Sequence, residues 1–228
     1  MKMPNLKKKA IALAVANASM IFALDVASEQ ILVTSEANAG SGSLREALGS
    51  ATKGDHVLID ATRVTNINLD SEISFYSEGL IISAPVDDAG RPQVTITATG
   101  GAEDPAQNRI FNIQGRPSEG SNPVTIISGL ELTGGYTESG SVQAWGGAIQ
   151  GLGVDVFLDK TVIADNKAHG AGGGIAIKGG SLCLRGSEVS GNTVGAAQNS
   201  GRKYAIGGGA AVSEGVIVVV PSIDEQLT

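Results

Sequence analysis

The chain has 228 residues and contains 32 glycines, with 42% hydrophobic but only 4% aromatic residues. Its formal net charge of −7 leaves little positive charge to neutralise phosphates, so we predict no nucleic-acid partner. One cysteine and two histidines exclude a disulfide framework and make a metal site built on these residues improbable. Abundant glycine with aliphatic side chains favours thin layers between closely spaced backbones.

Residues 1–28 predict an export signal. Residues 1–9 carry four lysines, and residues 10–24 form an apolar stretch that is short for a membrane span. Small residues follow, so we expect cleavage near Ser28, with Ala39 as a later alternative. The alternative interpretation is that this N-terminal segment is an uncleaved membrane anchor. The predicted location is the cell surface, the outer membrane or the extracellular space.

Residues 29–54 are predicted to form an N-terminal cap with one helix, over Ser43–Lys53. Ser43 and Glu46 have the spacing of a capping box, and Lys53-Gly54 supplies a basic last turn and a glycine stop. Arg45 and Glu46 are expected to face solvent or the capping turn. The apolar residues lie on one helical stripe: Leu44, Ala47, Leu48 and Ala51.

Short β-prone runs make up most of the remaining chain, separated by turn-forming residues. The runs in the first half are Ile31–Thr34, Val57–Ile59, Ile67–Leu69, Ile73–Phe75, Leu80–Ile82, Val94–Ile96 and Ile110–Ile113. Such a pattern fits either a β-sandwich or a stack of repeats.

A 26-residue repeat favours the stack. It relates Gly146–Ile149 to Gly172–Ile175, and it carries Thr161, Ile163 and Asn166 onto Ser187, Val189 and Asn192. It also relates the pairs Leu130/Leu132, Val156/Leu158 and Leu182/Leu184. A third glycine motif, Gly207–Val212, follows after 35 residues, so we predict a loop at Gln198–Lys203.

These observations predict an all-β chain, a right-handed parallel β-helix (a solenoid) with a short N-terminal capping helix. Residues 55–228 would form the coils, because a unit of this size buries its apolar face only by stacking on its neighbours. Val156 and Leu158 should point inward, and the glycines should form tight corners. Asn166 and Asn192 are expected at left-handed corners, with their amides bonded along the axis.

The stretch Ala39–Ile59 resembles the module named after its Cys-Ser-Leu-Arg-Glu-Ala core, found near the start of bacterial surface β-helix proteins. Ser43–Ala47 and Gly54-Asp55 match that module, and Gly42 replaces its cysteine. The later repeats resemble polymorphic outer-membrane proteins and autotransporter passengers, whose Gly-Gly-Ala-Ile motif stands at Gly146–Ile149. The Phe-x-x-Asn motif of that family lacks its phenylalanine here. The resemblance spans roughly residues 39 to 220.

The resemblance implies an exported passenger or adhesin-like scaffold without catalysis. Its partners would be host or environmental surface ligands, such as glycans or proteins. The repeat register fails near Asp224, and no translocator barrel follows, so we expect a chain truncated at its C-terminus. Outer-membrane association would then depend on the missing part. The alternatives are a β-helix polysaccharide lyase or hydrolase, and a non-functional fragment of a longer surface protein.

No catalytic, cofactor-binding or metal-binding residue is predicted, although three features admit a functional interpretation. Asp159, stacked over Arg185, fits a lyase site or a simple ion pair between strands. Asp87-Asp88 fits a metal site or a turn in which aspartate bonds its own backbone. The glycine runs near Gly172 and Gly207 fit structural corners better than phosphate binding.

Two further places in the sequence, at Cys183 and at Trp145, each have two interpretations. Cys183 follows Phe157 by one repeat, and both side chains are expected to face outward. They either form an apolar contact strip or lie under a loop. Trp145 is a sugar-stacking platform or packs beneath the Tyr136–Ala144 loop.

Overall fold

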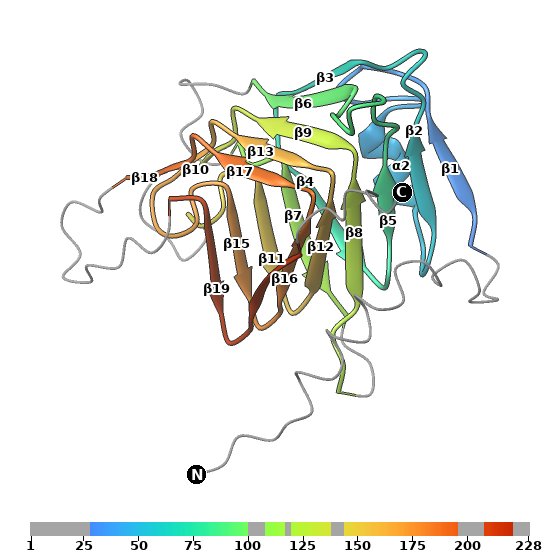
Figure 1. The fold of residues 1–228 in the computed structure, drawn as a ribbon. Coiled ribbons are helices and arrows are strands. Elements are labelled where there is room, and N and C mark those ends of the chain that lie inside the picture. Colours follow the sequence, from blue (N-terminus) through green and yellow to red (C-terminus); the bar gives the residue numbers. More distant parts are fainter. Residues whose placement is uncertain (1–27, 100–107, 117–119, 138–143, 196–207, 221–228) are drawn as a thin grey trace, which may run out of the picture.

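The computed structural model describes residues 28–99, 108–116, 120–137, 144–195 and 208–220, which form four parallel sheets and one short helix (Figure 1). The seven-stranded sheet contains β1 (Gln30–Val33), β2 (His56–Ile59), β5 (Ile81–Ser83), β8 (Val124–Ser128), β12 (Asp155–Asp159), β16 (Leu182–Arg185) and β20 (Ile217–Val220). The predicted all-β class is confirmed.

The other three sheets are each named here after their first strand. The β3 sheet contains β3 (Asn66–Leu69), β6 (Val94–Ala98), β9 (Leu130–Thr133), β13 (Val162–Ala164) and β17 (Glu188–Ser190). The β4 sheet contains β4 (Ile73–Ser77), β7 (Phe111–Gly115), β11 (Ile149–Leu152), β15 (Ile175–Lys178) and β19 (Ala210–Ser213). The β10 sheet contains β10 (Tyr136–Thr137), β14 (Lys167–Ala168) and β18 (Thr193–Val194).

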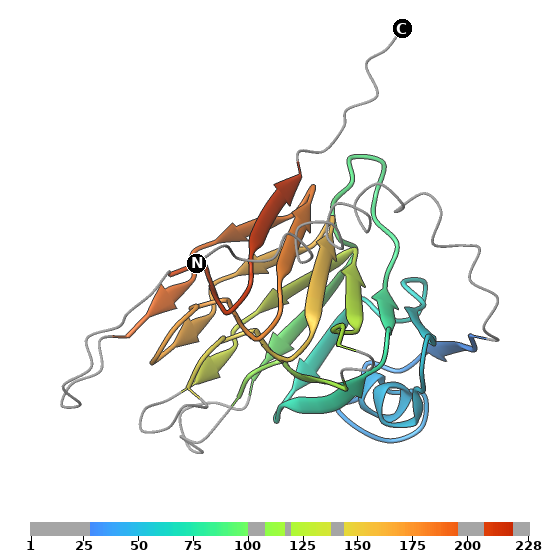
Figure 2. The ribbon, with the colours of Figure 1, turned by 90° about the horizontal axis from the view of Figure 1, so that it is seen from below.

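The chain visits these sheets in a constant order. From β2 onward it passes from the seven-stranded sheet to the β3 sheet, then to the β4 sheet and back, and from β9 onward it adds a strand of the β10 sheet on the way. We use the word coil for one such passage. Successive strands of each sheet lie side by side along the molecule, in the order of the chain (Figures 1 and 2).

The 26-residue register is confirmed for the later coils but is wrong for Leu130 and Leu132. Ile149 pairs with Ile175, and Leu158 pairs with Leu184. Leu132, however, lies in β9 and pairs with Ile163, 31 residues later. Tyr136 and Lys167 are also 31 residues apart, so the five extra residues of this coil fall between β10 and β11. The predicted loop Gln198–Lys203 and Gly207 lie outside the described residues.

Aliphatic side chains form ladders in the interior, as predicted for Val156 and Leu158. One ladder on the seven-stranded sheet runs through Val57, Ile82, Ile127, Leu158 and Leu184, and it ends at Val219, which is 69% exposed. Its first four members are fully buried. Inward-facing residues of adjacent strands lie directly over one another in a parallel sheet, so each coil covers the apolar surface of the one before.

The asparagine amides bond along the stack, but they are not in the left-handed conformation. Asn166 Nδ2 donates to Asn192 Oδ1 at 2.9 Å, and Asn192 Nδ2 donates to the carbonyl of Ile163 at 2.7 Å. The positive φ angles belong to the preceding residues, Asp165 (55°) and Gly191 (63°). The bend is therefore made one residue earlier, which leaves each asparagine side chain free to bond the corner carbonyls.

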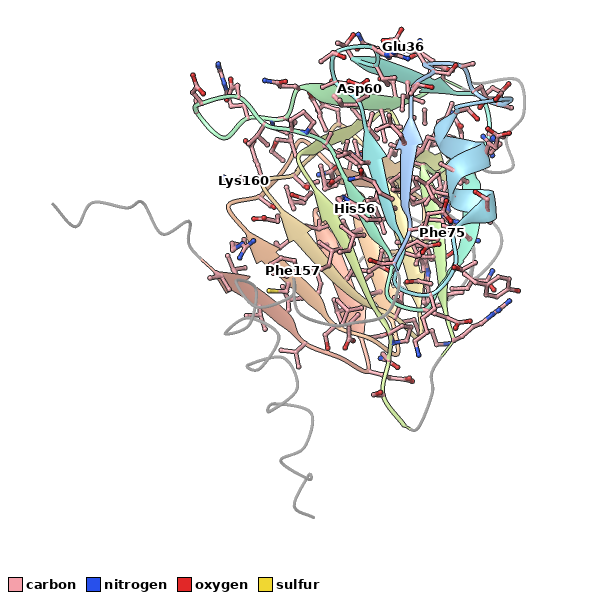
Figure 3. The ribbon with its side chains drawn as sticks, turned by 90° about the vertical axis from the view of Figure 1, so that its right-hand side faces the viewer. Glu36, His56, Asp60, Phe75, Phe157 and Lys160 are labelled. Carbon is pink, nitrogen blue, oxygen red and sulfur yellow. The ribbon has the colours of Figure 1, made fainter. Side chains whose placement is uncertain are left out.

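Helix α2 (Leu44–Ser50) lies at the predicted place and contacts β1, β2 and β4. The side chain of Ser43 accepts from Glu46 N–H at 3.2 Å, and the Glu46 carboxylate accepts from Gly42 N–H at 2.7 Å. The stripe faces inward, with Leu44, Ala47 and Leu48 buried. In Figure 3 the helix lies at the right-hand side of the view, beside the blue and cyan strands β1 and β2.

The helix is shorter than predicted, and Arg45 does not face solvent. The helix ends at Ser50 because Ala51 is already extended and the Asp55 carboxylate binds Thr52 N–H at 2.7 Å, which starts a turn. Arg45 is half-buried and donates to the carbonyls of Asn38, Ser71 and Glu72 at 3.1, 2.7 and 2.8 Å. It therefore joins the cap to the turn before β4.

The cap predicts that Leu44→Asp with Leu48→Asp causes aggregation. Two charges on the buried stripe would displace the helix and expose the edge strand β1 and the apolar interior beneath it. We expect a several-fold rise in scattered light. Because Arg45 is structural, the suitable control is Ser41→Asp with Ser50→Asp, both at exposed positions. Equal aggregation in the two double variants would show that the helix is only a linker.

Asp55 predicts a pH-dependent contribution to stability. Burial alone would raise the pKa of its carboxyl, but hydrogen bonds from Thr52 and Glu29 outweigh burial and lower the pKa. The stabilisation is therefore complete above the unfolded pKa of about 3.9 and is lost as the pH falls through the lower folded value. Asp55→Asn should cost about 1–3 kcal/mol at pH 7.

Urea unfolding of wild type and Asp55→Asn between pH 7 and pH 3 measures this contribution. The difference in free energy of unfolding should shrink toward acid pH. Asp88→Asn is the control, because the Asp88 carboxylate has no hydrogen bond to any residue that the structure describes. A difference that stays constant with pH would contradict the assigned pKa shift.

Candidate functional site

A groove of about 470 Å³ lies between the end of α2 and the edge strand β4. We call it the α2–β4 groove. Its lining residues are Leu48, Gly49, Ala51, Thr52 and Lys53 on the helix side, and Ser74, Phe75, Tyr76, Glu78 and Arg116 on the sheet side. Figure 3 labels Phe75, one of these lining residues, just below α2. The groove exists because the cap is a helix, whose round surface cannot continue the flat sheet beyond β4.

Strand alternation places an aromatic ring in this groove. Along β4, Ile73, Phe75 and Ser77 are buried, while the side chains of Ser74 and Tyr76 point outward. Tyr76 is 55% exposed, and it is one of the few large hydrophobic side chains with such exposure in the described residues. The signal was present in the sequence as the alternation Ile-Ser-Phe-Tyr-Ser, but sequence reasoning did not single out Tyr76.

Arg116 holds the Tyr76 ring in place. Its guanidinium carbon lies 4.2 Å from the ring centroid, within the range of a cation–π contact. The same guanidinium forms an ion pair with Glu78 at 3.3 Å, in which both side chains are exposed to solvent. Arg116 follows β7, the next strand of the sheet, and its N–H donates to the carbonyl of Ser77. Two neighbouring strands thus position the ring and its charged partner.

Lys53 brings a second positive charge to the groove. It is exposed and forms no ion pair with any residue that the structure describes. Lys53 and Arg116 together outnumber the single acid of the lining, Glu78, so the groove carries a net charge of +1. This positive site belongs to a chain whose formal net charge is −7.

The predicted stacking of Asp159 and Arg185 is confirmed, and it forms a bidentate ion pair. Arg185 Nε and Nη2 donate to the two oxygens of Asp159 at 2.9 and 2.7 Å. This pairing raises the pKa of Arg185. The guanidinium also lies 5.1 Å from the ring centroid of Phe157. Neither charge is free to bind a metal or to move a proton.

Asp87 bonds its own turn, in agreement with the structural reading. Its carboxylate accepts from the N–H groups of Ala89 and Arg91 and from the Arg91 side chain, and these bonds lower the pKa of Asp87, the side-chain bond most. Within the described ranges, no group of three or more histidine, cysteine, aspartate or glutamate side chains is placed to hold a metal ion.

The glycine run at Gly172 forms a corner, as expected. Gly172 has a φ of 60°, and a side chain there would lie 1.9 Å from the carbonyl oxygen of Ile175. The backbone therefore turns too tightly for any other residue. Trp145 packs its ring edge against Gly170, where an added Cβ would lie 2.4 Å from the indole. The loop expected above Trp145 is described only in part, since residues 138–143 lie outside the described ranges.

An outward column on the seven-stranded sheet joins Ile126, Phe157, Cys183 and Val218. Cys183 is buried, which raises the pKa of its thiol. Phe157, labelled in Figure 3, is half-buried on this face, and Arg185 covers part of it. His56 lies on the same sheet, with its Nε2 2.7 Å from the Ser83 hydroxyl.

Sequence reasoning also missed a buried ion pair. Arg109 Nη1 lies 2.6 Å from Glu72 Oε2, with side-chain exposures of 1% and 15%. Glu72 also accepts from Ser74 and Asn112, and Arg109 Nε donates to the carbonyl of Gly146 at 2.9 Å. The partners of the ion pair are 37 residues apart in the sequence, so no local sequence pattern predicts the pair. It joins three successive strands of the β4 sheet near their starts.

No helix in the described part of the chain is long and apolar enough to cross a membrane. The comparisons with protein-family models, curated proteins and solved structures found no match to this chain.

Proposed function

We propose that the chain is an exported, right-handed parallel β-helix that serves as a binding scaffold of the passenger or adhesin-like type. The observation that carries the proposal is the constant order in which the chain returns to the same parallel sheets. Parallel crossover connections are right-handed in about 98% of cases, which supports the handedness. Residues 1–28 support export through their basic and apolar segments.

The chemistry of the exposed residues supports binding rather than catalysis. The candidate charges at Asp87, Asp159 and Arg185 are each engaged by neighbouring groups. The α2–β4 groove, in contrast, presents an exposed aromatic ring and a lysine that forms no ion pair within the described ranges. An aromatic surface with a few polar groups is typical of a ligand site.

Export can be tested by expressing the whole chain in a Gram-negative host with a tag after Thr228. We expect a product shortened at its N-terminus by about 28 residues, found outside the cytoplasm. The control replaces Lys7, Lys8 and Lys9 by Glu, which removes the basic start of the signal and should keep the product in the cytoplasm. A full-length wild-type product in the cytoplasm would contradict the proposal.

A further inference from the structure

We propose that the α2–β4 groove binds an acidic oligosaccharide, one in which at least one sugar carries a carboxylate. This inference rests on the proposed function, since it names the ligand class of a scaffold that binds at the cell surface. Three properties of the groove support it: the exposed ring of Tyr76, the surplus of positive charge, and the polar rim on both sides.

The ring of Tyr76 offers a fixed apolar surface. The buried side chains of Phe75 and Ser77 on either side hold the strand in register, and the Arg116 guanidinium carbon lies 4.2 Å from the ring centroid. A pyranose has one face made of C–H groups, which packs against an aromatic ring and gains from burial. An ordered ring loses little conformational entropy when a ligand binds to it.

The positive charge selects an acidic sugar over a neutral one. The Glu78 carboxylate is engaged by Arg116, while Lys53, on the helix side of the groove, has no ion-pair partner among the residues that the structure describes. A sugar that packs on Tyr76 in the groove would bring its carboxylate toward Lys53. A neutral sugar could accept hydrogen bonds from this ammonium group but would not form an ion pair with it, so the acidic sugar gains more.

The rim and the volume fit a short saccharide. The rim carries the hydroxyl groups of Thr52 and Ser74, one on each side, which donate to Asp55 and Glu72 and can accept hydrogen bonds from sugar hydroxyls. A volume of about 470 Å³ lies within the usual range for small-ligand sites. An acidic peptide would match the charge, but it lacks a flat C–H face for the tyrosine ring.

The test is a binding measurement with the mature chain against pairs of oligosaccharides that carry glucuronic, galacturonic or sialic acid. Each acidic member is compared with its carboxyl-reduced form and with a poly-glutamate peptide. We expect at least tenfold tighter binding of an acidic saccharide than of either comparison. Tyr76→Ala should weaken that binding tenfold or more, and Lys53→Gln should weaken it several-fold and reduce its dependence on salt.

Two matched variants control for fold and for general charge. Tyr76→Phe keeps the ring, and Lys178→Gln removes an exposed lysine from the same sheet, outside the groove. Tyr76→Phe should retain most of the binding that Tyr76→Ala loses, Lys178→Gln should bind like the wild type, and thermal melts should show all four variants folded. Binding that is equal for saccharide and poly-glutamate, or absent for every acidic saccharide, would overturn the proposal. Saccharide binding that survives Tyr76→Ala would reject this groove while leaving the scaffold function intact.

Discussion

Leu158→Asp is expected to unfold the stack. Leu158 is fully buried in the aliphatic ladder, between Ile127 and Leu184. A carboxylate there has no partner in the interior ladder, so it must stay charged in an apolar interior or take up a proton at a cost of several kcal/mol. Domains have a total stability of about 5–15 kcal/mol, so one such change removes a large part of it. Far-UV circular dichroism during thermal melting measures the loss.

Two control variants separate charge from burial. Lys178→Asp introduces the same residue at an exposed position of a strand and should change stability by less than about 0.5 kcal/mol. Leu158→Ala should fall between the two, with a loss of about 2–5 kcal/mol from the cavity it creates. Melting curves of Leu158→Asp that coincide with those of the wild type would show that Leu158 is not inside.

Arg109→Met should cost about 3–5 kcal/mol, because it breaks a buried ion pair and leaves one charge without its partner. Glu72 would keep only hydrogen bonds from Ser74 and Asn112, and the carbonyls of Trp145 and Gly146 would lose their donor. Burial lowers the pKa of Arg109, whereas the charge and the hydrogen bond of Glu72 raise it. The charged form of Arg109 is therefore stabilised by the presence of Glu72. Chemical denaturation at neutral pH gives the free energy of unfolding.

The control for Arg109 is Arg63→Met, which breaks an exposed pair with Asp60 at 3.5 Å and should cost less than about 1 kcal/mol. The double variant Arg109→Met with Glu72→Met removes both charges and should recover part of the loss. An equally small loss for Arg109→Met and Arg63→Met would show that the buried pair does not stabilise the fold.

The strands and the cap were predictable because their signals are local. All seven β-prone runs of the first half became strands, and the ends of these strands moved by one or two residues at most. The capping spacing of Ser43 and Glu46 placed the start of α2 correctly. The predicted end of α2 was wrong, because the observed end depends on the Asp55 carboxylate. This carboxylate binds Thr52 and also Glu29, which is 26 residues away.

The register of the first coils could not be found from one repeat length. Coils differ in size: Phe111 and Ile149 pair at a distance of 38 residues, and Ile149 and Ile175 pair at 26. A fixed offset therefore aligned Leu130 with Val156, although Thr125 is the neighbour of Val156. Insertions in loops leave no trace in the apolar pattern of the strands, because the pattern has a period of two in every coil.

Composition, apolar alternation and repeat spacing were enough to establish an all-β chain of parallel strands with a short N-terminal helix. Aliphatic ladders need only the right kind of residue at equivalent positions, and such positions are visible in the chain. The Arg45 contacts, the Glu72–Arg109 pair and the α2–β4 groove arise only in three dimensions. Apart from the local bond between Arg45 and Asn38, they join residues 26 to 38 positions apart, through coils of unequal length, and so their partners are set by how the coils stack.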